Sequence, residues 1–199
     1  MAQISTYASI QNPTLDDKLI GTDIENENLT KNFTISSVLG LKQISLTNVL
    51  AAVDTTNQEP SGLDSALQVK FGAAQKTATD PVMLDALGNI TFNQAGLYLF
   101  NGYANFERQG SSGGVAVTLF RALLNGVQTG PTKGVELSGT GIMFPYELTL
   151  PIQVSAGNVL TWEIMRDSSG VNAGGLYIHT NSGPWSNVPS TDVNIYKVG

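Results

Sequence analysis

Apolar and polar residues alternate with a period of two over most of the chain beyond residue 65. The clearest run begins at Ile142, where the even positions stay apolar as far as Val154 while the odd positions include Glu147. This alternation is typical of a β-strand with one buried face. A turn at 155–158 separates the run from a second one at 160–164, and the two together predict neighbouring antiparallel strands.

Comparable runs predict about eight to ten antiparallel strands, joined by short turns. The predicted strands are 66–71, 82–84, 90–92, 96–106, 115–124, 142–154, 160–164, 176–180 and 192–198. Within 96–106, a single face carries Tyr98, Phe100, Ala104 and Phe106. Asn125-Gly126 is a hairpin signal. Strands at this spacing favour an all-β sandwich or barrel.

The first 64 residues follow a different pattern, with short apolar clusters in a polar stretch. Runs at 19–23 and 30–35 predict two strands that pair as a hairpin. We expect a helical turn at 36–39 and a short helix at 46–53 capped by Ser45. A stretch rich in turn residues follows at 54–64 and is typical of a linker.

The chain is therefore expected to consist of a small mixed arm (1–53), a linker (54–64) and a β domain (65–199). The arm is too small to bury a core by itself. Its apolar residues nevertheless form a compact set, which favours an arm ordered against a partner over a disordered tail. The candidate attachment residues are Leu19, Ile20, Phe33, Ile35, Val38 and Leu39.

Composition narrows the classes of function. The net charge of −6, with half of the 16 acidic residues in the first 64 positions, argues against a nucleic-acid-binding face. The acidic arm fits either a basic partner or a solvated surface. No cysteine is present, so disulfides and thiolate metal sites are excluded. The sequence shows neither a signal peptide nor an apolar run of membrane-spanning length, so we expect synthesis in the cytoplasm without membrane insertion.

Catalytic patterns are weak. Gly110 to Gly114 matches Gly-x-Ser-x-Gly, but that motif needs a strand–turn–helix context and a paired histidine, and His179 is far along the chain. Glu147 and Glu163 are outward-facing carboxylates, which we interpret as solvated charges rather than a glycosidase pair. We expect no enzyme activity, no metal site and no cofactor; only three copies of His179 on a symmetry axis would offer an ion site.

Trp185 lies in a polar loop at 182–187. Such an aromatic residue can stack on a sugar ring or anchor an interface. It can equally fold back over the end of the β domain. Trp185 is therefore a candidate for surface recognition, with packing as the alternative.

The β domain resembles the trimeric jelly roll of tumour necrosis factor and the complement-type globular head. The matching segments, in order, are Phe92, Gly96, Tyr98 and Phe100; Leu119 through Asn125-Gly126; Leu150 to Ile164; and the terminal strand Val193 to Tyr196. The resemblance covers about 65–199 and implies a homotrimeric jelly-roll sandwich. A collagen-like stalk and cysteines are both missing, which sets the chain apart from animal signalling ligands.

The arm resembles the N-terminal attachment segment of phage tail-fibre and virion proteins. The resemblance covers about forty residues and is carried by Pro13 to Asp23 followed by Thr30 to Ile35. It implies that the arm docks on the particle and that the trimeric domain is displayed outward.

Several apolar residues lie on the face opposite to the expected core alternation. Threefold packing would bury them, whereas loops covering both faces are the alternative. The candidate trimer-interface residues are Leu97, Leu99, Tyr103, Met143 and Met165.

These observations predict a structural protein of a tailed-phage virion: a head fibre, a capsid decoration protein or a short tail-fibre component. Its expected partners are further copies of itself, capsid or tail proteins, and a host surface glycan. The alternative is a carbohydrate-binding host-attachment module. A hydrolase of cell-surface polysaccharide is a third hypothesis, which the lack of an acid/base pair disfavours.

Overall fold

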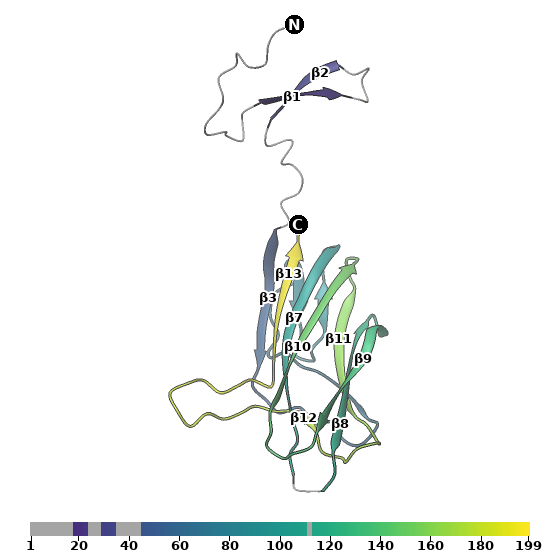
Figure 1. Ribbon diagram of the computed structural model, residues 1–199, viewed down its shortest axis with the longest axis vertical. Helices are drawn as coiled ribbons and strands as arrows, with labels where there is room; N and C mark the ends of the chain where they lie inside the picture. Colours follow the sequence, from purple (N-terminus) through teal and green to yellow (C-terminus); the bar gives the residue numbers. More distant parts are fainter. Residues whose placement is uncertain (1–17, 24–28, 35–44, 111–112) are drawn as a thin grey trace. The chain divides into compact units, whose positions relative to one another are not determined.

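The computed structural model describes residues 18–23, 29–34, 45–110 and 113–199. The chain forms two compact units, one made of residues 1–45 with Gly199 and the other of residues 46–198 (Figure 1). The described residues contain strands and no helix. The all-β class predicted from the alternation is therefore confirmed.

The first unit contains a β-hairpin. Strand β1 (Lys18–Asp23) pairs antiparallel with β2 (Leu29–Thr34), in a register that runs from Lys18 opposite Thr34 to Asp23 opposite Leu29. The predicted hairpin is thus confirmed. The expected helical turn at 36–39 lies outside the described residues.

The second unit is an antiparallel β-sandwich. Its strands are β3 (Leu46–Asp54), β4 (Ala66–Gln68), β5 (Val82–Leu84), β6 (Ile90–Phe92), β7 (Gly96–Glu107), β8 (Ala116–Leu124), β9 (Val127–Leu137), β10 (Phe144–Val154), β11 (Val159–Arg166), β12 (Gly175–Leu176) and β13 (Thr191–Val198). Sheet I has the order β10-β7-β13-β3, with β12 also paired to β7. Sheet II has the order β5-β6-β11-β8-β9, with β4 also paired to β11.

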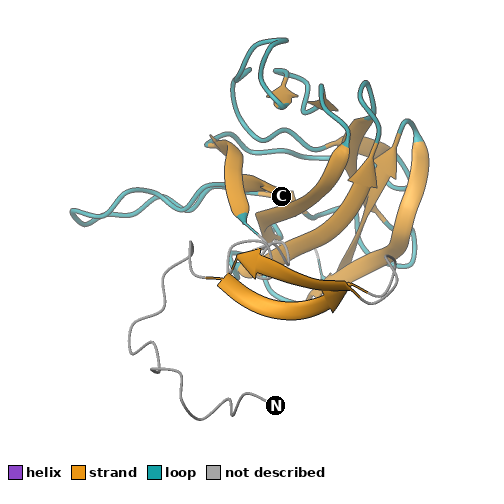
Figure 2. Cartoon of the chain, turned by 90° about the horizontal axis from the view of Figure 1, so that it is seen from above, coloured by secondary structure: helices purple, strands orange, loops and turns teal. Residues whose placement is uncertain are grey.

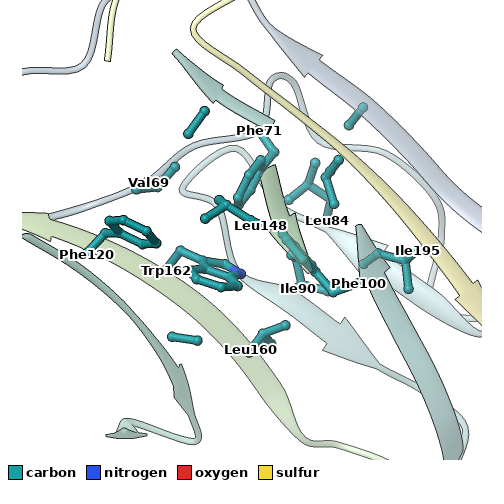
Figure 3. Packing of buried hydrophobic residues seen from close by; sticks show 14 of the residues in the cluster. Val69, Phe71, Leu84, Ile90, Phe100, Phe120, Leu148, Leu160, Trp162 and Ile195 are labelled. Carbon is teal, nitrogen blue, oxygen red and sulfur yellow. The ribbon is translucent and has the colours of Figure 1, made fainter. Parts of the chain in front are cut away.

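Aromatic side chains from both sheets meet in the core (Figure 3). Phe100 of sheet I lies with its ring centroid 5.1 Å from that of Trp162 of sheet II, and Phe71 packs edge-on against Phe100 at 5.7 Å. The predicted inward face of β7 is confirmed, because its aromatic positions are fully buried. The predicted inward face of β10 holds from Tyr146 onward, whose ring packs against Phe120 with centroids 4.9 Å apart, whereas Phe144 at its start is exposed.

The prediction of a short helix at 46–53 is wrong, because this segment forms strand β3. Leu50, Ala52 and Asp54 are buried while the residues between them are exposed, which is the period of a strand. The strand pairs along its whole length with β13, a partner nearly 150 residues away that a local capping signal does not reveal. The boundary of the sandwich therefore lies at Ser45–Leu46 instead of beyond residue 53.

The segment 54–64, expected as a linker, is tied to the sandwich. Gln58 exchanges backbone hydrogen bonds with Leu176 at 2.8 and 2.9 Å. The buried Gln58 side chain also donates to the Lys70 carbonyl at 2.9 Å and accepts from the Lys70 N–H at 2.7 Å. Asp64 donates its N–H to the Arg166 carbonyl at 2.7 Å. The segment is thus held along its length as part of the folded unit.

Strand β9 was not among the predicted strands, although the Asn125-Gly126 signal implied a partner for β8. Both turn residues have positive φ angles, 52° and 78°, as a tight hairpin requires. Most of β9 is exposed, with Val135 and Leu137 buried near its end, and its pairing with β8 is interrupted around Gly130 to Thr132. An exposed edge strand that contains glycine and proline lacks the alternation that marks a buried one.

Candidate functional site

The outward face of sheet I presents four cross-strand rows, each running from β3 through β13 and β7 to β10. The rows are Leu46, Val198, Leu97 and Gln153; Asn48, Tyr196, Leu99 and Pro151; Ala51, Asn194, Asn101 and Thr149; and Val53, Asp192, Tyr103 and Glu147. We call this set the sheet I outer face. It is apolar at one end, carries amides in the middle and is acidic at the other end.

Large apolar side chains on the sheet I outer face are open to solvent. Leu46 is 56% exposed, Val53 53% and Leu97 40%. None of the sixteen positions is a lysine or arginine, the residues that commonly guard exposed sheet surfaces and edges. The end of the face that carries Leu46, Leu97 and Leu99 is therefore an apolar surface without cations, a composition typical of the core of a protein interface.

The acidic end of the face surrounds a cavity of about 260 Å³, lined by Asn101, Tyr103, Glu147, Asp192 and Asn194. Burial raises the pKa of the Asp192 carboxyl. Burial also raises the pKa of the Tyr103 phenol, and the negative charge of Asp192 adds to that effect. Any partner that covers this end must therefore accept or neutralise negative charge.

The structure brings together three of the five candidate interface residues. Leu97, Leu99 and Tyr103 are outward positions of β7 and lie on the sheet I outer face. Met143 lies in the exposed turn before β10. Met165 lies outward on β11, which belongs to sheet II, so it is on the opposite side of the sandwich. Strand alternation alone could not distinguish the two outward faces.

Other members of the sheet I outer face were missed in the sequence, among them Tyr196, Val53 and Asn194. The alternation in 192–198 was visible and would have placed Tyr196 and Asn194 on one side of that strand. Val53 was assigned to a helix, so its place beside Asp192 emerged only from the pairing of β3 with β13.

The candidate attachment residues fall partly within the first unit's hairpin. Leu19 and Ile20 belong to β1 and Phe33 to β2, and Leu19 and Phe33 are directly opposite each other in the register. Ile35, Val38 and Leu39 lie outside the described residues.

Trp185 lies in the long loop between β12 and β13, which extends away from the sheets (Figure 2). His179 and Val188 exchange two backbone hydrogen bonds of 3.0 Å at the base of this loop. Within the loop, the Asn187 side chain accepts from the Asn181 N–H at 2.9 Å. Trp185 is 80% exposed and does not fold back over the sandwich, which favours surface recognition over packing.

The candidate acid/base residues do not converge. Glu147 lies outward on sheet I and Glu163 outward on sheet II, so the sandwich separates the two carboxylates. His179 is exposed. It lies near Glu107, whose pKa is raised by burial and lowered in part by the charge interaction with His179. Over the described ranges, no three His, Cys, Asp or Glu side chains group as a metal site. A helix long and apolar enough to cross a membrane is also not found in the described part of the chain.

Comparisons with known proteins returned no relative: no protein-family model matches the chain, and no curated protein matches it.

Proposed function

We propose that this protein is a non-enzymatic, homotrimeric structural component of a tailed-phage virion. In this proposal the first unit docks on the particle, and the β-sandwich is a jelly roll that trimerises through the sheet I outer face and is displayed outward. Head fibre, capsid decoration protein and short tail-fibre component are the roles that this arrangement fits.

The path of the chain between the sheets supports a jelly roll. Within the second unit, the chain crosses from one sheet to the other at β3 to β4, β6 to β7, β7 to β8, β9 to β10, β10 to β11 and β11 to β12. Within sheet II, β8 and β9 form a long hairpin, and β5 pairs antiparallel with β6 over three residues. Repeated crossing between two antiparallel sheets is the connectivity of a double Greek key.

The observation that carries the trimer is the sheet I outer face, because its exposed leucines and missing cations favour a neighbour over water. A second copy of the chain suits the apolar rows, since each copy brings the same uncharged Leu97 and Leu99 surface. The edge of β10 is unsuited to strand addition because Pro145 and Pro151 lack the N–H group that pairing needs. Association is therefore expected through the sheet face rather than by extending the sheet at β10.

The virion role rests on the resemblance of residues 13–35 to phage attachment segments, and on the division of the chain at Ser45–Leu46. In this proposal the hairpin of β1 and β2 is the docking element, because a unit this small is too short to bury a core by itself and is suited to folding against a larger partner. Residues 1–45 carry five acidic residues and three lysines, a net charge of −2 that slightly favours a basic docking surface on that partner.

Light scattering on the full chain and on a chain that begins at Ser45 tests the oligomer. Both are expected to have three times the single-chain mass of 21.1 kDa, corrected for the residues removed. A single-chain mass for both at micromolar concentration would contradict the trimer. Mass spectrometry of gradient-purified particles, produced from the genome that encodes the chain, tests the virion role, which fails if the chain is absent from them.

A second candidate function is host attachment through a glycan, favoured by the 80% exposure of Trp185 in its projecting loop. A tryptophan ring in this position can stack on the apolar face of a sugar. Glycan-array binding that is lost in Trp185→Ala, with the unfolding temperature unchanged, would support this function. A glycan array to which the protein does not bind would contradict this second function.

A further inference from the structure

The outer face of sheet II contains a small trough between β4, β8, β9 and β11. It encloses about 180 Å³ and is mostly apolar. Its floor is formed by Ala66, Leu119 and Met165, and its rim carries Arg121, Glu163 and Thr132. We call this the β8–β11 trough. It lies on the opposite side of the sandwich from the sheet I outer face, so a trimer formed through sheet I leaves it open.

The backbone explains why the sheet is hollow at this point. Gly134 stands opposite Leu119 in the β8–β9 register, and a Cβ at Gly134 would come within 3.0 Å of the Leu119 Cδ2 atom. Leu119 therefore extends over a position without a side chain. Next to it, the register between β8 and β9 shifts after Phe120, so the edge strand does not fill the space. The result is a flat apolar floor with room above it.

The polar rim has an asymmetric ion pair. Arg121 and Glu163 are directly opposite on β8 and β11, and the Arg121 Nε and Nη2 atoms both donate to Glu163 Oε2, at 2.9 and 2.8 Å. No hydrogen bond from the described residues reaches Glu163 Oε1 or Arg121 Nη1. The Arg121 side chain is 42% exposed and the Glu163 side chain 26%. A donor and an acceptor thus stand side by side above the apolar floor, each fixed in place by the same ion pair.

This combination selects a class of ligand. An anion would be repelled by the Glu163 carboxylate and by the net charge of −6, and a cation would be repelled by the Arg121 guanidinium. A purely apolar ligand would remove water from Arg121 Nη1 and Glu163 Oε1 without offering them new hydrogen bonds, which is unfavourable. A neutral ring with adjacent hydroxyl groups satisfies both, because each hydroxyl can donate and accept.

We infer that the β8–β11 trough binds one neutral pyranose residue of a glycan, with its C–H face on Leu119 and Met165 and two adjacent hydroxyls on Arg121 and Glu163. The trough is smaller than the cavities of roughly 300–1,000 Å³ that hold drug-sized ligands, which suits a single ring. The inference is independent of the virion role and of Trp185. In a trimer, binding of one trough to a glycan-bearing surface would raise the effective concentration of glycan at the other two, so the avidity would exceed the weak affinity of a single trough.

The methionines provide a direct test on the full chain. The sequence has four, and Met165 lies in the trough while Met83 and Met143 lie elsewhere. With ¹³C-methyl methionine, the protein is titrated with methyl glycosides of glucose, galactose, mannose and N-acetylglucosamine. Concentrations reach about 50 mM, since one ring on such a small site has a Kd on the order of 1 mM. A saturable shift of the Met165 signal, with Met83 and Met143 unmoved, is expected for at least one glycoside.

Matched variants identify the contacts. Glu163→Gln and Arg121→Lys are each expected to weaken binding about tenfold, because the first replaces a charged acceptor with a neutral amide oxygen and the second removes the planar guanidinium that holds a donor beside it. Glu136→Gln makes the same chemical change as Glu163→Gln on an exposed position of β9 outside the trough and should leave binding unchanged. Thermal unfolding of each variant reports whether it has folded. If Glu163→Gln does not fold, Arg121→Lys tests whether the trough binds the glycoside.

Each of the following results would overturn the inference: no saturable Met165 shift with any glycoside, equal binding by Glu163→Gln and Glu136→Gln, or the same shift with glycerol, which has hydroxyls but no ring. Loss of binding in Trp185→Ala with the trough variants unaffected would also overturn it, by moving the sugar to the loop. Light scattering of the same samples reports the trimer separately, so failure of either proposal is seen on its own.

Discussion

Tyr103 and Asp192 occupy directly paired positions on β7 and β13, on the outward face of sheet I. Burial raises the pKa of Asp192, and burial together with the Asp192 charge raises that of Tyr103. The folded protein thus holds a carboxyl group whose charged form is disfavoured by burial, on the surface where we place the trimer contact. Two consequences of this surface can be measured, one with pH and one by substitution.

The pH dependence has a definite sign. Because the pKa of Asp192 in the folded protein exceeds its ordinary value of 3.8, the folded state binds more protons than the unfolded state between the two values. The contribution of Asp192 to stability is therefore most favourable below pH 3.8 and declines as the pH rises through the raised pKa. Asp192→Asn is expected to stabilise the protein at pH 7, by at most about 1 kcal/mol, and to make no difference near pH 3.

Urea unfolding at the two pH values measures this effect. Asp80→Asn is the control of opposite sign, because the Thr77 backbone N–H and then the Thr77 hydroxyl lower the pKa of Asp80. That variant should lose stability at pH 7. If Asp192→Asn were the less stable protein at pH 7, the assignment of Asp192 as a carboxyl destabilised by burial would be wrong.

The trimer contact is tested by Leu97→Asp. A carboxylate placed in the apolar rows of the sheet I outer face should separate the subunits, because the change removes an apolar contact and buries a charge. A loss of about 2 kcal/mol or more per subunit is expected in the association free energy, measured by sedimentation equilibrium. Leu87→Asp changes the same residue type at a position that is 63% exposed in a turn, and it should leave the trimer intact. Equal dissociation in both variants would argue against the sheet I outer face.

The aromatic core predicts a large effect at one position. Phe100 is fully buried and contacts both Trp162 and Phe71, so Phe100→Ala is expected to lower the free energy of unfolding by about 3–5 kcal/mol. Phe144→Ala removes the same ring from a residue that is 43% exposed and should cost less than about 1 kcal/mol. Guanidinium unfolding of both variants makes the comparison. Similar losses would mean that the core is not centred on Phe100.

Truncation tests the corrected boundary. A chain that starts at Ser45 retains β3 and should unfold at nearly the same temperature as the full chain. A chain that starts at Ser65 loses β3, leaves the β13 edge unpaired and removes Gln58 from the Lys70 backbone, so it should be insoluble or unfold at a much lower temperature. Circular dichroism melts compare the two, and equal stability would show that 45–64 contributes little to the fold.

Much of the fold could be predicted because its strands carry their own period. The inward aromatic residues of β7 and the Asn125-Gly126 turn were visible in the sequence, since burial and a tight turn each impose a local pattern. Strand β9 was not found in the same way, because most of it is exposed and its buried alternation is confined to Val135 and Leu137 at its end.

The candidate surfaces were less predictable than the strands. Leu97 and Leu99 were recognised as outward, but Met165 was grouped with them although it faces the other side of the sandwich. Alternation states only that a residue points away from its own inward neighbours; it carries no information about which sheet the strand joins. The trough was missed for a similar reason, since Arg121 and Glu163 are 42 residues apart and meet only through strand pairing.

The sequence by itself determined the all-β class, the hairpin of the first unit, the inward faces of the long strands and the low charge of the surface. These are properties of residues and their near neighbours, where side-chain period and turn chemistry act. Only the tertiary structure decided that 46–53 is a strand, that 54–64 is held on the sandwich, and which outward residues share a face. In each case the deciding contact joins segments far apart in the chain, such as Leu50 with Ile195, and local propensity yields to the burial that this pairing provides.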